Sequence, residues 1–444
     1  MKKVWIRLAA AAMVLSMFAG CSAETGSSSS SETGSSSSSS SSSAESSEQA
    51  EQSGEKVNLE LFWYTDGIET EAMRRVLDKY EEDNPNITVE MMEVPYADLN
   101  NKLMMAISGG EPPALARVTS NQTFYDVALD LTDVFGGEEE FFALYPEFVR
   151  QDTDICLDGK IYTVPMEASI TGLYYNATAF EKAGVSVPQS PDEIWTWEEF
   201  AEKLNTVMEK GGVQYGLAID KTTQRWSTIL YEFGGKYLNE DGNPAFTSDK
   251  TRECLEFTKE MFDNGTFVKS VYLGGEDANN LFRSGQVAAH LSGSWNITAV
   301  HDNVEDFEWG VTYLPYQEDR ANIIGYKGVI GFQGSGVEEE TKQLLLYLAS
   351  KEASTSYCSE SLFISPRLDC ADIEYSFGQE IFAVLADEQA HAGEDSVFDM
   401  KYPGWYSACN TTIIDGLCSY IAGDITADEF MAEVDAKTAE VLAE

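Results

Sequence analysis

Short runs in which apolar and polar residues alternate are interleaved with stretches of helical periodicity along most of the chain. Residues 57–63 alternate and then merge into an aromatic end, which predicts a strand, while residues 69–83 place apolar side chains at helical spacing. Residues 87–91 predict the next strand and residues 96–108 the next helix. This order favours βαβ units on a mostly parallel sheet, so we expect an α/β fold.

The same alternation continues toward the C-terminus without an internal repeat. Thr196 and Ser248 occupy N-cap positions, Thr196 within a capping box. No second Ser- or Pro-rich linker occurs, so any domain boundaries must be crossovers within one body. The further strands expected are 161–164, 172–175, 214–219, 287–292 and 329–333, and the further helices are 177–184, 248–264, 279–284, 338–350, 425–443 and one opening at 196.

The first 21 residues have the character of an export signal. Lys2, Lys3 and Arg7 precede an apolar stretch, residues 8–19, that is too short to remain as a membrane-spanning helix. Small residues and Cys21 follow, an ending that resembles a bacterial lipoprotein signal. We expect residues 1–20 to be removed and Cys21 to be lipidated; the alternative is an ordinary secretory signal with an incidental cysteine.

The segment that follows is dominated by serine, with 18 Ser in the 35 positions from 22 to 56. Such a segment has too few apolar residues to offset the entropy of ordering it, so residues 21–56 are expected to form a disordered tether behind the lipidated cysteine. Its root-mean-square reach is about 30 Å. A domain held off the membrane surface by a lipid anchor explains both features.

Charge narrows the possible partners. The chain has 75 Asp+Glu against 29 Lys+Arg, a net charge of −46. This balance disfavours nucleic acid, anionic lipid surfaces and polyanions, which are bound by clustered Lys and Arg. It makes a neutral ligand the first expectation, a cation the second and an anion the last.

Residue types limit the chemistry further. The chain has three scattered histidines, and its six cysteines beyond Cys21 contain no CxxC, so we expect neither a metal site nor a cofactor. Whether those cysteines are free thiols or form one or two disulfides is left open.

Several segments in a defined order carry a resemblance. They include Asn-Pro-Asn-Ile-Thr-Val at 84–89, Ile-Ser-Gly-Gly-Glu-Pro-Pro at 107–113, Asp-Gly-Lys-Ile-Tyr-Thr-Val-Pro at 158–165, the stretch from Leu281 to Trp295, and Pro-Gly-Trp-Tyr at 403–406. Together they resemble the carbohydrate-type (family 1, maltose-type) extracellular solute-binding proteins of ABC importers, over about residues 57–444.

The resemblance implies a two-lobed, periplasmic-binding-protein-like α/β fold with a ligand cleft between the lobes. The N-lobe would hold residues 57–166 and 330–368, and the C-lobe residues 167–329 and 369–444. It also implies a function without catalysis. A monomer on the extracellular face of the membrane would bind a mono- or oligosaccharide and deliver it to permease subunits.

A sugar presents apolar faces to aromatic rings and hydroxyls to polar side chains. By resemblance, Trp295 and Trp405 are the expected stacking residues. The first strand ends in Trp63 and Tyr64, followed by Asp66 in the family's first loop. The other candidates lie in loops or crossovers, and we expect the remaining ligand contacts from Trp226, Glu111, Glu167, Tyr326, Arg367 and Tyr406.

Two other functions remain open. A polyamine or other small-solute binder would use acids and aromatics for a cationic ligand. A secreted glycoside hydrolase would need two carboxylates about 5–10 Å apart with separated pKa values. The chain carries none of the local catalytic signatures.

Overall fold

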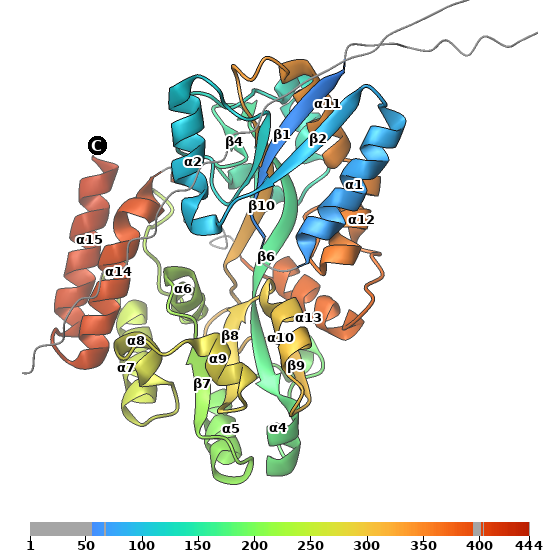
Figure 1. Cartoon of the computed structure of the whole chain (residues 1–444). Coiled ribbons are helices and arrows are strands. Elements are labelled where there is room, and N and C mark those ends of the chain that lie inside the picture. The colour runs from blue at the N-terminus through green and yellow to red at the C-terminus, as the bar shows by residue number, and fades with distance from the viewer. Residues whose placement is uncertain (1–55, 66–67, 394–400, 403, 444) are drawn as a thin grey trace, which may run out of the picture. The chain divides into compact units, whose positions relative to one another are not determined.

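The computed structural model describes residues 56–65, 68–393, 401–402 and 404–443 (Figure 1). The predicted signal peptide, the lipidation of Cys21, nearly all of the tether and Asp66 lie outside the described residues. None of the described helices is long and apolar enough to cross a membrane.

The described elements confirm an α/β protein. Its strands are β1 Val57–Trp63, β2 Ile87–Glu93, β3 Leu115–Val118, β4 Cys156–Leu157, β5 Lys160–Ile161, β6 Thr163–Asn176, β7 Tyr215–Ile219, β8 Val287–Gly293, β9 Trp309–Thr312 and β10 Ile324–Gly331. Its α-helices are α1 Glu69–Asp83, α2 Tyr96–Gly109, α3 Glu138–Phe142, α4 Ala177–Ala183, α5 Trp197–Lys210, α6 Thr223–Glu232, α7 Asp249–Asp263, α8 Lys269–Leu273, α9 Ala278–Arg283, α10 Asn296–Asn303, α11 Glu338–Leu348, α12 Lys351–Ser361, α13 Gln379–Ala390, α14 Trp405–Ala422 and α15 Ala427–Leu442. Short 3-10 helices are η1 Thr132–Phe135, η2 Glu147–Gln151, η3 Pro191–Glu193 and η4 Leu368–Cys370.

The main sheet runs β2-β1-β3-β10-β6-β8-β7, with β9 also pairing β6, and β4 and β5 form a separate hairpin. The pairs β1–β2, β1–β3 and β7–β8 are parallel. The pairs β3–β10, β10–β6, β6–β8 and β6–β9 are antiparallel. The expectation of a mostly parallel sheet was therefore wrong, because β6 and β10 lie in the middle of the sheet and are antiparallel to each of their neighbours.

The long strand β6 joins the two lobes. Its first half, up to Ile170, pairs with β10, and from Thr171 onward it pairs with β8 and β9. The two strands expected at 161–164 and 172–175 are thus largely one strand of 14 residues. Polar Glu167, Ser169 and Thr171 interrupt its apolar pattern, which made it look like two separate strands.

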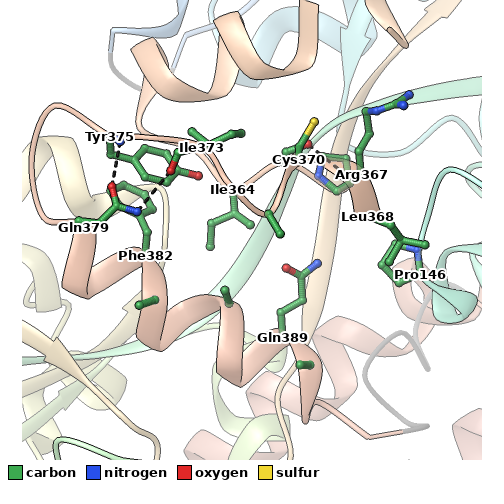
Figure 2. A pocket seen from close by; sticks show the side chains of 16 residues that line it. Pro146, Ile364, Arg367, Leu368, Cys370, Ile373, Tyr375, Gln379, Phe382 and Gln389 are labelled. Atoms are coloured by element: carbon green, nitrogen blue, oxygen red, sulfur yellow. Dashed lines mark hydrogen bonds between the residues drawn. The ribbon is translucent and has the colours of Figure 1, made fainter. Parts of the chain in front are cut away.

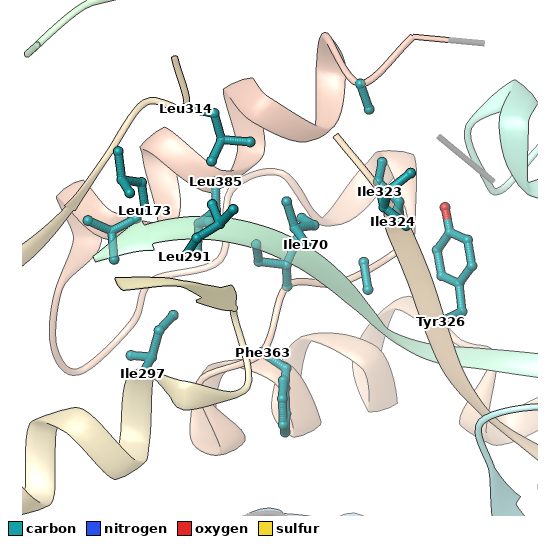
Figure 3. Packing of buried hydrophobic residues seen from close by; sticks show 14 of the residues in the cluster. Ile170, Leu173, Leu291, Ile297, Leu314, Ile323, Ile324, Tyr326, Phe363 and Leu385 are labelled. Atoms are coloured by element: carbon teal, nitrogen blue, oxygen red, sulfur yellow. The ribbon is translucent and has the colours of Figure 1, made fainter. Parts of the chain in front are cut away.

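Helices complete each lobe (Figure 1). In the N-lobe α1 packs against α12, and α11 lies on β10; in the C-lobe α13 packs on β6 and β9, and the pair α14–α15 packs on α7. Figure 3 shows Ile170 and Leu173 of β6 among Leu291 of β8 and Leu385 of α13. The predicted lobe boundaries at 166/167 and 329/330 fall inside β6 and β10, and they stay predictions.

Local sequence signals account for several helix starts. Thr196 and Glu199 form the predicted capping box at the start of α5, and the Ser248 side chain accepts a hydrogen bond from the Thr251 backbone N–H at α7. The first turn of α6 begins in the same way, because the Thr222 hydroxyl accepts from the Arg225 backbone N–H at 3.2 Å. This last cap fixes where Arg225 lies.

Candidate ligand-binding cleft

A cavity of about 400 Å³ lies where β6 passes from one set of strand partners to the other. That volume is within the range of small-molecule sites, roughly 300–1,000 Å³. The residues that line it come from both lobes: Tyr64, Tyr96, Thr119, Ser169, Thr222, Gln224, Arg225, Trp295, Ile323, Ile324, Gly325, Tyr326 and Lys327.

The N-lobe wall is a pair of tyrosines. Tyr64 follows the last residue of β1, Tyr96 opens α2, and their ring centres are 5.0 Å apart. Tyr96 is 59% exposed, while Tyr64 is almost fully buried. The buried Arg117 holds Tyr64 from behind, donating to its carbonyl oxygen at 2.6 Å and lying 4.3 Å from the centre of its ring. One face of this pair can therefore receive a flat, partly apolar ligand.

The C-lobe wall is built from Trp295 and Arg225. The guanidinium carbon of Arg225 lies 4.9 Å from the centre of the Trp295 ring, and its Nη1 donates to the Thr171 hydroxyl at 2.6 Å. Trp295 covers Gly293, where an added Cβ would lie 1.8 Å from ring carbon Cζ3. The turn at 293–295 is tied to β6, since Ser294 N–H donates to the Ile170 carbonyl at 2.8 Å.

The floor of the cavity belongs to β10 and the middle of β6. Asn322 binds the Thr171 backbone twice, accepting from its N–H and donating to its C=O, both at 3.0 Å. This pairing fixes the path of Ile323 and Ile324 into the cavity wall. The hydroxyl oxygen of Ser169 is buried and has no hydrogen-bond partner among the described residues, so a ligand hydroxyl could bind it.

A buried ion network supports the floor. Glu167 Oε1 accepts from Arg117 Nη2 at 2.6 Å and lies 3.1 Å from Lys327 Nζ, and its Oε2 accepts from the Tyr357 hydroxyl at 2.6 Å. Arg117 Nη1 also donates to Glu69 at 2.9 Å. Burial disfavours the Arg117 charge, but Glu167, Tyr357, Tyr64 and Glu69 together outweigh it, and the pKa of Arg117 is raised above its ordinary value. Glu167, a predicted ligand contact, is thus engaged by protein groups on both of its oxygens.

Three other groups around the cavity are electrostatically perturbed. Burial, and then the charge of Asp152, raises the pKa of Tyr326 above its ordinary value, so its hydroxyl stays protonated at neutral pH. Burial raises the pKa of Asp154 to about 6 against the hydrogen bonds from Asn121 and Ser120. Burial also acts on Asp220, but the His290 ring, 2.8 Å away, and the Ser292 hydroxyl outweigh it, and the pKa of Asp220 is lowered.

Of the predicted contacts, Trp295, Tyr64 and Tyr326 line the cavity together. Three predicted tryptophans instead lie in the core. Trp63 meets Tyr357 edge-on at 6.2 Å, Trp226 packs against Phe246 at 6.0 Å, and Trp405 lies 5.3 Å from Tyr237, all measured between ring centres. None of the three is exposed to solvent.

The remaining candidates also lie off the cavity wall. Tyr406 is half-buried beside Trp405, and Glu111 is exposed beyond the end of α2 that is distant from Tyr96. Arg367 binds Asp369 at 2.8 Å through Nε and Nη2 and lines a different cavity of about 510 Å³, bounded by α13 and residues 364–375 (Figure 2). Asp66 lies outside the described residues.

The sequence prediction did not include several lining residues, among them Tyr96, Arg225 and Lys327. One signal was present. Tyr96 follows Pro95 at a predicted helix start, and Thr222 is a cap that places the next residues of its helix at a strand–helix loop, the usual position of ligand contacts in α/β folds. Lys327 could not have been recognised, because its place in the cavity wall depends on how β10 pairs with β6.

Similar proteins share this architecture. A profile of the family described as bacterial extracellular solute-binding protein matches residues 75–381. The chain belongs to this family. Relatives include the arabinooligosaccharide-binding protein of Bacillus subtilis (strain 168), 21% identical over 79% of this chain and 77% of that protein. The multiple sugar-binding protein of Streptococcus mutans serotype c is 24% identical over 69% of this chain and 75% of that protein.

Solved structures confirm the two-lobed fold that this family has. The GacH receptor of Streptomyces glaucescens GLA.O, solved unliganded and in complex with acarbose, superposes with a TM-score of 0.73 at 17% identity, covering 88% of this chain and all of that one. The relatives are binding proteins, in keeping with the absence of local catalytic signatures in this family member. Within the described residues no group of three or more His, Cys, Asp or Glu is placed to hold a metal ion.

Proposed function

We propose that this solute-binding protein binds a mono- or oligosaccharide in the cleft between its lobes, outside the cell, and delivers it to the permease of an ABC transporter. The observation that carries the proposal is the pairing of two aromatic walls, Tyr64 with Tyr96 on one lobe and Trp295 on the other, across a cavity of about 400 Å³. Aromatic rings on two sides match the apolar faces of a pyranose. The hydroxyl and amide side chains that also line the cavity, among them Ser169 and Gln224, can bind the hydroxyls around the edge of the sugar ring.

Relatives and structural neighbours support the class of ligand. Proteins of this family bind arabinooligosaccharides and multiple sugars, by their names, and the GacH receptor was solved with acarbose. Permease subunits as partners follow from the family. The two lobes meet at β6 and β10, the segments about which a hinge motion would close the cleft on a ligand.

Attachment to the membrane is part of the proposal. Lipidated Cys21 would anchor the chain at the outer face, and residues 22–56 would give the body a reach of about 30 Å toward the permease. The sequence supports this arrangement, with a short apolar signal ending at Cys21 and a serine-rich segment behind it. Mass spectrometry of the mature N-terminus, compared with a Cys21→Ala variant, tests the anchor.

The two alternative functions are less compatible with the cavity. A polyamine would face the guanidinium of Arg225, which repels it. A glycoside hydrolase needs a pair of carboxylates at the sugar, and no Asp or Glu occurs among the described residues that line the cavity.

Thermal unfolding with a panel of sugars tests the proposed function. A specific ligand at 100 times its Kd stabilises the folded protein by about 2.7 kcal/mol, which is a shift of several degrees for a body of this size. Spermidine serves as the control for the polyamine alternative. A shift with spermidine and none with any sugar would contradict the proposal, and release of a cleaved product would indicate a hydrolase.

A further inference from the structure

A hydrogen-bonded network of four polar side chains, the Asp220 network, lies behind the C-lobe wall of the cleft. Asp220 directly follows β7, and its Oδ1 lies 2.8 Å from Nε2 of His290 on β8. Its Oδ2 accepts a hydrogen bond from the Ser292 hydroxyl, which in turn accepts from Nδ2 of Asn296 at 2.5 Å. Asn296 is the first residue of α10 and directly follows Trp295. Two hydrogen bonds therefore connect the Asp220 carboxylate to the residue after the stacking ring.

The backbone of Asp220 is bound to the same part of the fold. Its N–H donates to the Leu291 carbonyl on β8 at 3.2 Å, and its carbonyl accepts from the N–H of Thr222 at 2.7 Å. Thr222 is the N-cap of α6, and Arg225 lies in the first turn of that helix. Asp220 thus lies where the chain turns from β7 into α6, beside the strand that leads into α10.

The Asp220 carboxylate also acts on the cation of the wall. Burial raises the pKa of this group, but hydrogen bonds and charges oppose it. The His290 ring, the Ser292 hydroxyl and the Arg225 guanidinium together bring the pKa of the carboxyl below its ordinary value. Asp220 is therefore ionised at neutral pH, and its charge attracts the guanidinium that lies over the Trp295 ring.

The Asp220 network is separate from the surface that would meet a ligand. None of its four side chains lines the cavity. His290 is fully buried, its ring packs against Tyr174 and Phe282, and its Nδ1 has no hydrogen-bond partner among the described residues. Since the packed ring cannot turn away, its Nε2 holds the carboxylate of Asp220 at a fixed place.

The same residue types occur in serine hydrolases, but in a different order. In a catalytic triad the histidine lies between the carboxylate and the serine. Here the Asp220 carboxylate lies between Ser292 and His290, and Ser292 is fully buried. The arrangement therefore offers no activated nucleophile, and its effect is to hold side chains in position.

We propose that Asp220 is a positioning residue of the ligand site: its carboxylate holds Arg225 by charge and holds Trp295 through the hydrogen bonds of the Asp220 network. The inference rests on the proposed function, because the wall in question is the stacking surface for the sugar. A wall that is fixed before the ligand arrives loses less conformational freedom on binding, which raises affinity without a contact from Asp220 itself.

Fluorine NMR of the protein labelled with 5-fluorotryptophan tests the position of the ring without any sugar. Trp295→Phe assigns the line of Trp295, and Trp195→Phe assigns a reference line. We expect Asp220→Ala to shift and broaden the Trp295 line and to leave the Trp195 line unchanged. Asp220→Asn should shift the Trp295 line less, because an amide can replace the carboxylate at one of its two partners. An unchanged Trp295 line in Asp220→Ala, or in Asp220→Asn where only that variant folds, would overturn the inference.

Asp435 provides a matched control, a carboxylate that stabilises the C-lobe away from the cleft. It is half-buried, its two oxygens accept from the Phe246 and Thr247 backbone N–H groups at 2.9 Å each, and it does not line the cavity. Asp435→Ala should lower the midpoint of urea unfolding and leave the Trp295 line unchanged. Equal displacement of that line in Asp435→Ala and Asp220→Ala would indicate a general loosening of the lobe and would also overturn the inference.

Calorimetry with maltotriose, lactose and arabinotriose measures the consequence for binding. For a sugar that binds the wild type, Asp220→Asn is expected to raise Kd about tenfold, the typical effect of losing a hydrogen bond to a charged group. In a Trp295→Ala background the rise should be about threefold or less, because one of the two groups that Asp220 positions is absent. No rise, or the same rise in both backgrounds, would contradict the inference. Binding of no sugar would contradict the proposed function instead, and the fluorine lines would still decide the role of Asp220.

Discussion

The Arg225 guanidinium lies over the face of Trp295, 4.9 Å from its ring centre, so that one wall of the cleft is a single surface of cation and aromatic ring. Both residues lie next to helix N-termini that emerge from β-strand ends, α6 after β7 and α10 after β8. The parallel pairing of β7 with β8 brings those two strand ends together. The position of this wall therefore depends on the order of the strands in the sheet. Replacing either residue should displace the side chain of the other.

Replacing Trp295 by alanine should weaken ligand binding. The change removes the stacking face and the support of Arg225, and we expect a cost of about 2 kcal/mol, which is roughly a thirtyfold rise in Kd. Titration of intrinsic fluorescence or calorimetry measures it. Trp195→Ala is the matched control: Trp195 is also half-buried, stacks on Phe200 at 6.0 Å and does not line the cavity, so its loss should leave Kd unchanged. Equal effects of the two variants would contradict the role given to Trp295.

Adding a single methyl group at Gly293 should have a similar effect on binding. The Cβ of Gly293→Ala would lie 1.8 Å from Trp295 Cζ3, so the ring has to leave its position. We expect reduced affinity with secondary structure retained, measured by calorimetry and circular dichroism. Gly109→Ala, at the end of α2, meets no atom within 4 Å and should bind normally. A Gly293→Ala variant with unchanged Kd would show that the ring position does not matter.

Removing the buried cation behind the cleft should destabilise the fold. Arg117→Met leaves Glu69 and Glu167 without their shared partner in a buried site, at a cost of about 3–5 kcal/mol. Urea unfolding monitored by fluorescence would give a lower midpoint. Arg252→Met breaks an exposed pair with Asp428 and should cost about 0–1 kcal/mol. Similar midpoints for the two variants would be incompatible with the network as described.

A buried carboxyl group in the C-lobe should make stability depend on pH. Glu232 is fully buried, and burial raises its pKa well above the ordinary value of 4.5, although the Trp197 indole N–H donates to its Oε2 at 2.7 Å. A raised pKa means that the folded protein binds this proton more tightly than the unfolded chain does. The favourable contribution is therefore complete below about pH 4.5 and is lost as pH rises toward the folded-state pKa.

Glu232→Gln removes that proton linkage and keeps an acceptor for Trp197. We expect the variant to be more stable than the wild type at pH 8 and to lose less stability between pH 5 and pH 8, measured by urea unfolding at both values. Glu253→Gln, on the exposed face of α7, should follow the wild-type slope. A Glu232→Gln variant with the wild-type slope would rule out this group as the source.

Local sequence signals were sufficient to predict much of the fold. The bounds of α1, the capping box of α5 and the Ser248 cap follow from interactions within one turn of helix, which sequence displays directly. The course of β6 does not follow in this way, since it depends on strands more than 100 residues away, such as the pairing of Thr171 with Gly293. The helix α14 was missed because its apolar residues surround it on several sides and give a weak helical periodicity.

The candidate site was predicted less well for a related reason. Trp405 directly follows Gly404, and Trp295 follows Gly293 with one residue between them. Both lie at the start of a helix, so the two look alike in sequence. Only the packing separates them: the ring of Trp405 is covered by Tyr237, whereas Trp295 lines the cavity. Arg225 was not among the candidates, because the sequence does not show that it donates to the Thr171 hydroxyl and the Ser292 carbonyl, 54 and 67 residues away.

The continuity of β6 also bears on how the chain is made. Its first half needs β10, which ends at Gly331, before the central part of the N-lobe sheet can close. Most of the polypeptide must therefore have been synthesised before either lobe can finish folding. Contacts of such long sequence separation slow folding. A truncated chain that ends before β10 should therefore be prone to aggregation and to proteolysis.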